Sequence, residues 1–149
     1  MSKTNAFETD FSKLIFTDVA LTGIGDATGL RSDAVSAGTL QIALYPNGAE
    51  PTESNPGVEI TTEQYAGYAR VEVARSAVGW TVSGNNTSNA AAIQFPNCTG
   101  GTGVVATAVG IHAGGGVQLL YYGILDSNLS ISTGVQPQFA IGDLDINED

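Results

Sequence analysis

The amino-acid sequence predicts an all-β fold: an antiparallel β-sandwich, jelly-roll or Ig-like, with one short N-terminal helix. From residue 38 onwards, apolar and polar residues alternate along most of the chain, which is the pattern of half-buried strands. Segments rich in Gly, Asn, Ser and Pro interrupt this alternation at short intervals and predict turns. Helical periodicity is confined to a segment near the N-terminus. About seven short strands with one helix are typical of a β-sandwich.

The predicted helix covers residues 5–16 (NAFETDFSKLIF). Asn5 is expected to be its N-cap, and Glu8, three residues later, would complete a capping box. Its apolar side chains recur at helical spacing, so the helix should lay one face on another part of the protein. This apolar stripe consists of Phe7, Phe11, Leu14 and Ile15.

The first two predicted strands show clear alternation. GTLQIALY (38–45) places Leu40, Ile42 and Leu44 on one face. YARVEVARS (68–76) places small and apolar residues on one face and Arg70 with Glu72 on the other. Both segments read as strands with one buried face.

The remaining strands are expected in two hairpins and two closing segments. GWTVSGNNTSNAAAIQF (79–95) predicts a hairpin that turns near GNN, with Trp80 on its first arm and Ile93 and Phe95 on its second. VVATAVGIHAGGGVQLLYYGIL (104–125) predicts another hairpin that turns through residues 113–116. NLSIS (128–132) and QFAIGDLDI (138–146) supply two further strands.

We expect a single domain over residues 1–149, with the helix in 1–18, a loop arm in 19–37 and the sandwich in 38–149. The loop arm is rich in Gly, Asp, Thr and Ser and has Arg31 as its only cation. Loops longer than about 12–15 residues without secondary structure are usually functional or disordered. The loop arm and the N-terminal segment are therefore candidates for contact with a partner.

The charge balance and the length of the apolar runs exclude two classes of partner, nucleic acids and membranes. The chain has 5 basic and 15 acidic residues, for a formal net charge of −10. Nucleic-acid binding needs clustered Lys and Arg, so no nucleic-acid partner is expected. The apolar runs are shorter than the roughly 18 residues of a membrane span, so no membrane is expected either. Only 13% of residues are charged, and an uncharged polar surface suits protein contacts, including a homo-oligomer that is a dimer or trimer.

No residue pattern in the sequence assembles into an active site. His112 and Cys98 are the only residues of their kinds, and nucleophilic catalysis usually needs a nucleophile paired with a base. The acidic end DLDINED (143–149) could gather around calcium, but an alternating strand explains Asp143 and Asp145 without an ion. Calcium needs about 6–8 converging oxygens, which a single strand and a tail seldom supply. We therefore expect no enzyme activity, no cofactor and no metal.

Arg70 and Arg75 fall on opposite faces of their strand and cannot form a shared phosphate clamp. Two interpretations remain for them. The favoured one is that each arginine covers apolar surface with its stem and meets a nearby carboxylate. The other is that they anchor an interface, a role in which Arg is enriched. The predicted interface residues are Phe7, Phe11, Arg31, Arg70 and Arg75.

The order of several segments resembles that of small virion proteins of tailed bacteriophages, a family whose members are described as tail fibre or head decoration proteins. The segments that carry the resemblance are FETDFSKLIF, LQIALYPNG, YAGYARVEVA, GWTVSGNNTSNAAAIQFP, GIHAGGGVQLLYYGIL and VQPQFAIGDLDI. The resemblance covers nearly the whole chain. It implies a structural, non-catalytic protein located in the virion and assembled in the cytoplasm of the host bacterium.

Two functions follow from this resemblance. The favoured one is capsid decoration, in which the chain acts as a cement protein on the lattice of the major capsid protein or binds another virion protein. The alternative is a tail fibre or tail-tip module with a carbohydrate receptor-binding role. The aromatic candidates for stacking on a sugar would be Tyr45, Tyr65, Tyr68, Trp80, Tyr121 and Tyr122. Trp80 is expected to point inward, because strand aromatics are usually in the core.

Overall fold

A computed structural model describes residues 3–21, 37–116 and 118–148. The chain divides into two compact units, each built from separate stretches of sequence. Unit 1 contains Met1–Thr39, Val73–Ile93 and Phe139–Asp149, and unit 2 contains Leu40–Glu72 and Gln94–Gln138. The single domain over 1–149 stays a prediction. Most of the predicted loop arm, residues 22–36 with Arg31, lies outside the described residues.

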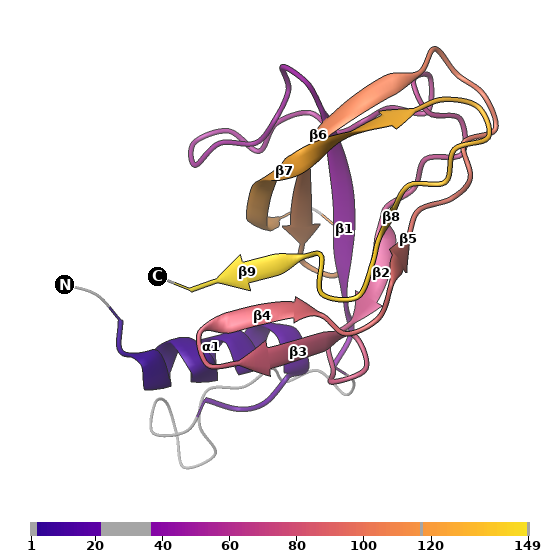
Figure 1. Ribbon diagram of the computed structural model, residues 1–149. Coiled ribbons are helices and arrows are strands. Elements are labelled where there is room, and N and C mark those ends of the chain that lie inside the picture. Colours follow the sequence, from indigo (N-terminus) through magenta and orange to yellow (C-terminus); the bar gives the residue numbers. More distant parts are fainter. Residues whose placement is uncertain (1–2, 22–36, 117, 149) are drawn as a thin grey trace. The chain divides into compact units, whose positions relative to one another are not determined.

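The predicted fold class, an all-β, sandwich-like fold of antiparallel strands with one short N-terminal helix, is confirmed. The described residues form a four-stranded sheet in the order β2-β1-β6-β7, a three-stranded sheet in the order β3-β4-β9 and the pair β5-β8 (Figure 1). The strands are β1 (Thr39–Pro46), β2 (Val71–Ala74), β3 (Trp80–Ser83), β4 (Asn86–Asn89), β5 (Ile93–Gln94), β6 (Val104–His112), β7 (Leu119–Ile131), β8 (Gln138–Phe139) and β9 (Asp145–Asn147).

Unit 1 is the helix α1 (Asn5–Thr17) packed against β3 and β4, and Figure 1 shows α1 running along these strands. The helix exists where it was predicted, but its N-cap is Thr4 and not Asn5. The Thr4 hydroxyl accepts a hydrogen bond from the Phe7 backbone N–H at 3.4 Å. This shift by one residue removes Glu8 from the third helical position, so the predicted capping box is wrong.

The buried face of α1 also differs from the predicted stripe. Its buried residues are Glu8, Ser12 and Phe16, which follow one another at i, i+4 spacing, whereas Phe7 is 36% exposed and Phe11 is half-buried. The Phe16 ring packs on the Trp80 ring at a centroid distance of 4.9 Å. This aromatic pair, and not the Phe7 stripe, joins the helix to the sheet.

The first hairpin forms with a different second arm. β3 pairs with β4 from Trp80–Asn89 to Ser83–Asn86, leaving a two-residue turn at Gly84 and Asn85. Gly84 has φ +65°, as the first turn position of a type II′ hairpin requires. The predicted turn is confirmed, but the predicted second arm at Ile93 and Phe95 is wrong, because the polar segment Asn86–Asn89 returns beside β3.

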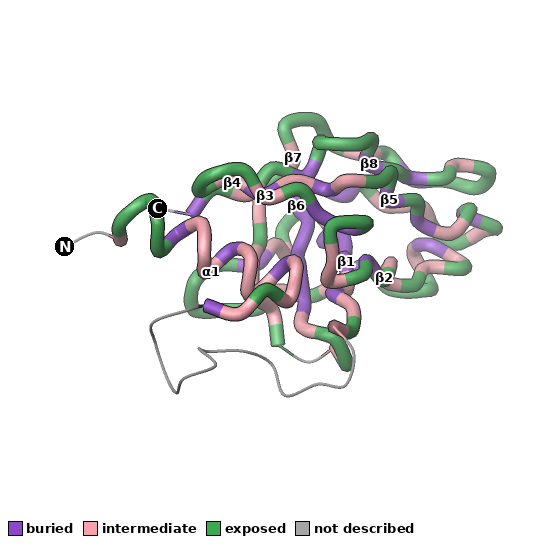
Figure 2. The backbone as a smooth tube through the Cα atoms, turned by 90° about the horizontal axis from the view of Figure 1, so that it is seen from below, coloured by how far each residue is buried: buried purple, intermediate pink, exposed green. Residues whose placement is uncertain are grey.

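Unit 2 is built on β1 and β6, which are buried along most of their length (Figure 2). The antiparallel register pairs Ile42 with Ile111 and Leu44 with Val109. The predicted strand at 38–45 and the predicted hairpin at 104–125 are both confirmed, and the hairpin turn lies between His112 and Leu119 as expected.

The glycine in the middle of β6 has a packing role. A Cβ at Gly110 would lie 2.8 Å from Cε2 of Tyr45 and 2.7 Å from Cδ1 of Leu119. Both distances are too short for a side-chain atom, so the missing side chain leaves room for these two residues on the sheet.

The closing strands differ from the prediction in length. β7 continues through Leu129 to Ile131 and includes most of the predicted strand at 128–132, and its register with β6 skips residues 125–128. The predicted strand at 138–146 is two shorter strands, β8 and β9, because Gly142 adopts φ +83° and the Asp143 backbone N–H bonds to Ala140 O at 3.2 Å. That turn separates β8 from β9, so the two segments do not form one continuous strand.

Candidate functional site

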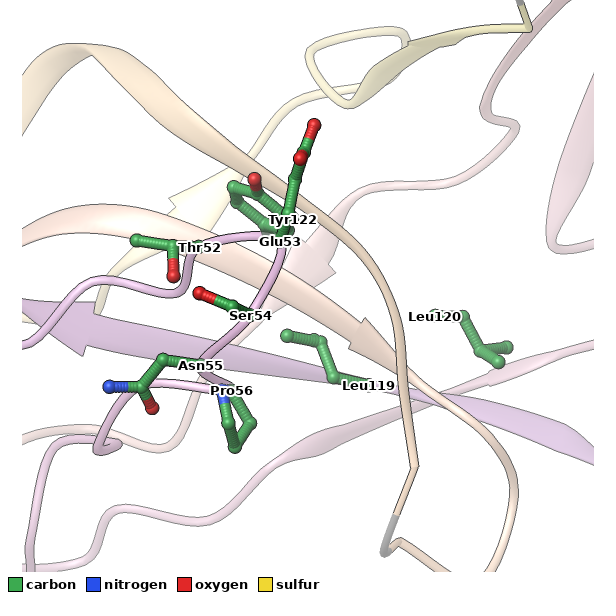
Figure 3. A pocket seen from close by; sticks show the side chains of 8 residues that line it. All are labelled: Thr52, Glu53, Ser54, Asn55, Pro56, Leu119, Leu120 and Tyr122. Atoms are coloured by element: carbon green, nitrogen blue, oxygen red, sulfur yellow. The ribbon is translucent and has the colours of Figure 1, made fainter.

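A pocket of about 430 Å³ lies in unit 2 between the loop after β1 and the start of β7. Side chains from the loop and from β7 line it together, and Figure 3 shows Tyr122 beside Glu53. Its lining residues are Thr52, Glu53, Ser54, Asn55, Pro56, Leu119, Leu120 and Tyr122. The volume lies within the roughly 300–1,000 Å³ of small-molecule sites.

The loop wall of this pocket is held in one conformation by its own hydrogen bonds. Thr52 and Asn55 exchange two backbone hydrogen bonds, at 2.7 and 3.2 Å. The Asn55 side chain accepts from the Gly57 N–H at 3.0 Å, and the Val58 N–H donates to Ala49 O at 2.9 Å. The pocket wall is therefore ordered without a ligand.

Gly57 is required at the end of this loop. It has φ +72°, and a Cβ there would lie 2.6 Å from Ala49 O and 2.8 Å from Pro51 N. A side chain would be both conformationally strained and in collision with backbone atoms. The fold of the pocket wall thus depends on this position.

Of the aromatic residues considered for sugar stacking, Tyr122 is the one with a large exposed surface. Tyr122 is 42% exposed, whereas Tyr45, Tyr65 and Trp80 are each at most 1% exposed. The prediction that Trp80 points inward is confirmed. Tyr68 and Tyr121 are half-buried.

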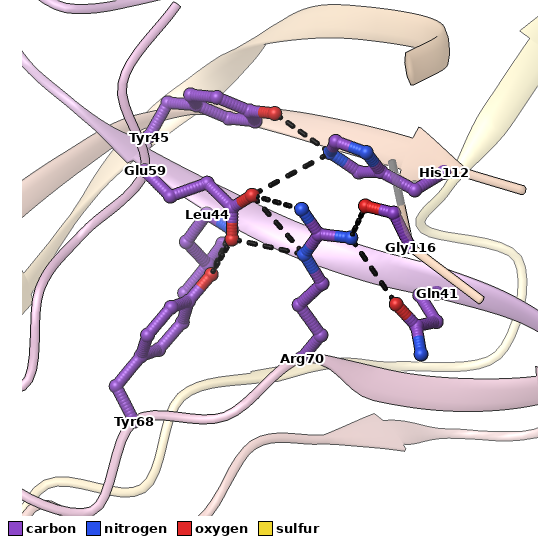
Figure 4. A network of polar contacts seen from close by, with 8 residues as sticks. All are labelled: Gln41, Leu44, Tyr45, Glu59, Tyr68, Arg70, His112 and Gly116. Carbon is purple, nitrogen blue, oxygen red and sulfur yellow. Dashed lines mark hydrogen bonds and ion pairs between the residues drawn. The ribbon is translucent and has the colours of Figure 1, made fainter. Parts of the chain in front are cut away.

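A cluster of polar residues centred on Arg70 lies elsewhere in unit 2 (Figure 4). The Arg70 guanidinium donates from Nε to both carboxylate oxygens of Glu59, each at 3.1 Å, and forms an ion pair with that carboxylate. It also donates to Gln41 Oε1 at 3.1 Å and to the backbone carbonyl of Gly116 in the turn before β7. Arg70 therefore links segments that lie far apart in the sequence.

Two tyrosines and the histidine complete the Arg70 cluster. Tyr68 donates to Glu59 Oε2 at 3.3 Å and accepts from the Leu44 backbone N–H at 2.9 Å. The Tyr45 hydroxyl and His112 Nε2 share a hydrogen bond of 2.8 Å. His112 Nε2 lies 3.8 Å from Glu59 Oε1.

The electrostatics of this cluster keep its aromatic members uncharged. Burial raises the pKa of Tyr45 to about 12, with the Glu59 charge adding to the shift, and burial also raises the pKa of Tyr68. Burial, helped by the Arg70 charge, lowers the pKa of His112. Hydrogen bonds to Glu59 raise the pKa of Arg70, so the ion pair stays charged.

The Arg70 cluster holds the structure of unit 2 together. Arg70 meets a carboxylate, as the favoured interpretation of the sequence expected, and its role as an interface anchor stays a prediction. Sequence reasoning missed Glu59 and Gln41, because nothing in their local pattern distinguishes them from other loop or strand residues. His112 is 3% exposed and is a packing residue of this cluster.

Arg75 binds the C-terminal end of α1 within unit 1. Its Nε donates to Ile15 O at 2.8 Å, and its terminal nitrogens donate to Leu14 O at 2.8 Å and Ala37 O at 2.9 Å. It also pairs with Asp18, the left-handed C-cap residue of the helix, at 3.2 Å. A cation at this position satisfies backbone carbonyls that the helix leaves unpaired. The predicted interface role of Arg75 stays a prediction.

The other predicted interface residues are not brought together with the pocket in unit 2. Phe7 and Phe11 stack at a centroid distance of 6.2 Å, and Lys3 lies 5.9 Å from the Phe11 ring. Both phenylalanines lie on α1 in unit 1. Their contact with a partner stays a prediction.

The described residues contain no group of three or more His, Cys, Asp or Glu side chains placed to hold a metal ion. Within the same part of the chain, no helix has the length and apolar character needed to cross a bilayer.

An all-β chain with a part-buried polar cluster and a surface pocket belongs to the broad class of β-rich structural and binding proteins. Comparison with known proteins gives the family. Residues 16–147 match the family described as Podophage GP4 fiber I protein gp80, and the chain belongs to this family. No curated protein matches it. The chain is thus a structural protein of a bacteriophage virion, and the resemblance found in the sequence is confirmed.

Proposed function

We propose that this protein is a non-catalytic building block of a podophage tail fibre. The observation that carries the proposal is the match of residues 16–147 to a phage fibre family. This reading replaces capsid decoration, which the sequence first favoured, as the better-supported function. Binding to the major capsid protein remains the competing hypothesis, and its support is the resemblance to decoration proteins alone.

The proposed assembly partner is a further copy of the chain. β7 lies at the edge of the four-stranded sheet, and its first part, LLYYGI (119–124), carries no charge. Ile124 is 66% exposed there. Proteins that remain monomeric usually protect sheet edges with charges, Pro or bulges. The opposite edge, β2, contains Glu72 and is flanked by arginines. The stretch of β7 suited to pairing is therefore its uncharged first part, which ends before the register with β6 breaks at 125–128.

Self-association is tested by placing a charge on the β7 edge. Ile124→Lys should shift the wild-type dimer or trimer to monomer in analytical ultracentrifugation, because a lysine on an edge strand opposes pairing. Ile141→Lys is the matched control, since Ile141 is 69% exposed but lies outside β7. Wild-type protein that sediments as a monomer at every concentration would refute the assembly proposal.

The fibre function is tested in phage that lack this protein. We expect particles with filled, stable heads that lack a tail fibre and fail to adsorb to the host. Supplying the chain in trans should restore both the fibre and adsorption. Particles with intact fibres but heat-sensitive heads would favour capsid decoration instead.

A further inference from the structure

We propose that the pocket between Thr52–Pro56 and the start of β7 binds a neutral saccharide. The inference deepens the proposed fibre function and rests on it for the source of the sugar, a bacterial cell surface. The pocket itself is argued from the residues that line it.

Part of the pocket lining is apolar. Tyr122 is 42% exposed, and Leu119 and Pro56 line the same pocket. A flat aromatic ring gives a rigid apolar contact at a low cost in side-chain entropy. Such a platform fits the C–H face of a sugar ring.

The loop after β1 gives the pocket a polar lining. Thr52, Ser54 and Asn55 bring hydroxyl and amide groups that both donate and accept hydrogen bonds. Glu53 adds an acceptor. The hydroxyls of a sugar also donate and accept, so four consecutive polar loop residues that line one pocket with an aromatic residue match a polyhydroxylated ligand.

The pocket lining carries no positively charged side chain. Of the eight lining residues, Glu53 is the one charged residue, and none is Lys, Arg or His. The whole chain has a formal net charge of −10. An anionic ligand would meet repulsion with no cation to offset it, so the charge pattern favours a neutral sugar over a sialic or uronic acid.

The loop wall of the pocket is fixed by hydrogen bonds within the loop. The hydrogen bonds between Thr52 and Asn55, and from Gly57 to Asn55, hold the loop wall without a ligand. Leu119 occupies its place on the sheet because Gly110 leaves room for it. A preformed site loses less conformational entropy on binding, which matters for a small ligand with few contacts.

Saturation-transfer NMR on the purified full chain tests the proposal. The probes are glucose, galactose, rhamnose, N-acetylglucosamine and maltotriose, with N-acetylneuraminic acid as the anionic comparison. We expect transfer to at least one neutral sugar and none to the anionic one. Transfer to no neutral probe, or equal transfer to the anionic probe, would overturn the proposal.

Variants assign the binding to the pocket. Tyr122→Ala should weaken the affinity for the bound sugar about tenfold, and Tyr122→Phe should preserve it because the ring remains. Ser54→Phe, which places a ring in the pocket from the loop, should weaken the affinity at least as much as Tyr122→Ala does, and Ile141→Ala should leave it unchanged. Circular dichroism checks that each variant is folded. Undiminished binding in both Tyr122→Ala and Ser54→Phe contradicts the assignment.

The outcomes separate this inference from the fibre proposal. Sugar binding is measured on the purified chain and does not depend on its place in the virion. A chain located in the fibre that binds none of the probes overturns only the pocket assignment. A chain located on the head that binds sugar through Tyr122 overturns only the fibre proposal.

Discussion

Replacing Trp80 tests the core of unit 1 most sharply. Trp80 is 1% exposed, and its ring packs on Phe16 with centroids 4.9 Å apart and an interplanar angle of 59°. We expect Trp80→Ala to lower the free energy of unfolding by about 3–5 kcal/mol, the range for truncating a buried aromatic residue. About 0.5–1.5 kcal/mol of this is the aromatic pair itself.

A second substitution separates packing from hydrogen bonding. Among the described residues, none accepts a hydrogen bond from Nε1 of Trp80. Trp80→Phe therefore removes volume but no hydrogen bond, and we expect a smaller loss of about 1–2 kcal/mol. The assay is urea unfolding followed by far-UV circular dichroism, because the variants lack the only tryptophan of the chain.

The control for this series is Val58→Ala, since Val58 is 65% exposed. It should change the free energy of unfolding by less than about 0.5 kcal/mol. The reasoning would be refuted if Trp80→Ala cost as little as this control, or if Trp80→Phe cost as much as Trp80→Ala.

Three further predictions concern the arginine at the helix end, the histidine of the Arg70 cluster and the pocket loop. Arg75→Ala should lower the free energy of unfolding in urea by about 2 kcal/mol, because three backbone carbonyls lose a charged donor. Arg75→Lys should recover only part of this loss. Equal stability of the wild type and both variants would contradict the capping role. Burial lowers the pKa of His112 in the folded protein. As the pH falls, the unfolded chain therefore binds a proton at this residue before the folded protein does. Below the unfolded pKa, His112 should lower the free energy of unfolding by up to about 1.4 kcal/mol per pH unit. His112→Gln should flatten this dependence, and an unchanged slope would refute it. Gly57→Ala should destabilise the protein by about 1–3 kcal/mol more than Gly48→Ala. Both glycines have positive φ, but a Cβ would collide with backbone atoms at Gly57 and would meet nothing at Gly48. Equal thermal midpoints for the two variants would contradict the clash.

Local alternation was sufficient to predict the central strands. Most apolar residues of the segment at 38–45 and of the first arm of the hairpin at 104–125 are buried, and so are Ala43 and Tyr45, which alternation placed on the other face of their strand. The second arm of the hairpin is mostly half-buried or exposed, so alternation located the strands but not the extent of their burial. The turn at Gly84 was also predictable, because a short polar turn with Gly and Asn lies beside a strand that carries Trp80.

The second arm of that hairpin could not be read from hydrophobicity. β4 is Asn86–Asn89, and its buried residues Thr87 and Asn89 are polar. The Asn89 side chain donates to Ala91 O at 2.8 Å and Ala140 O at 2.7 Å, and accepts from the Leu144 N–H at 2.9 Å. Partners distant in the sequence satisfy this amide, so the strand is buried without apolar alternation.

The helix face and the pocket were missed for related reasons. The face of α1 that is buried carries Glu8 and Ser12, whose burial depends on tertiary contacts and not on their polarity. The pocket joins the loop residues 52–56 to Tyr122. The contact between this loop and β7 depends on the order of the strands in the sheet, which short-range sequence patterns do not reveal.

Locating the chain in the intact particle tests the central claim of this account most directly. A cryo-EM map of the virion, with antibody labelling of the chain to identify its density, gives its position. The account predicts density for this all-β protein in the tail fibre and label confined to the tail. Label distributed over the capsid lattice, with none on the tail, would contradict the fibre function.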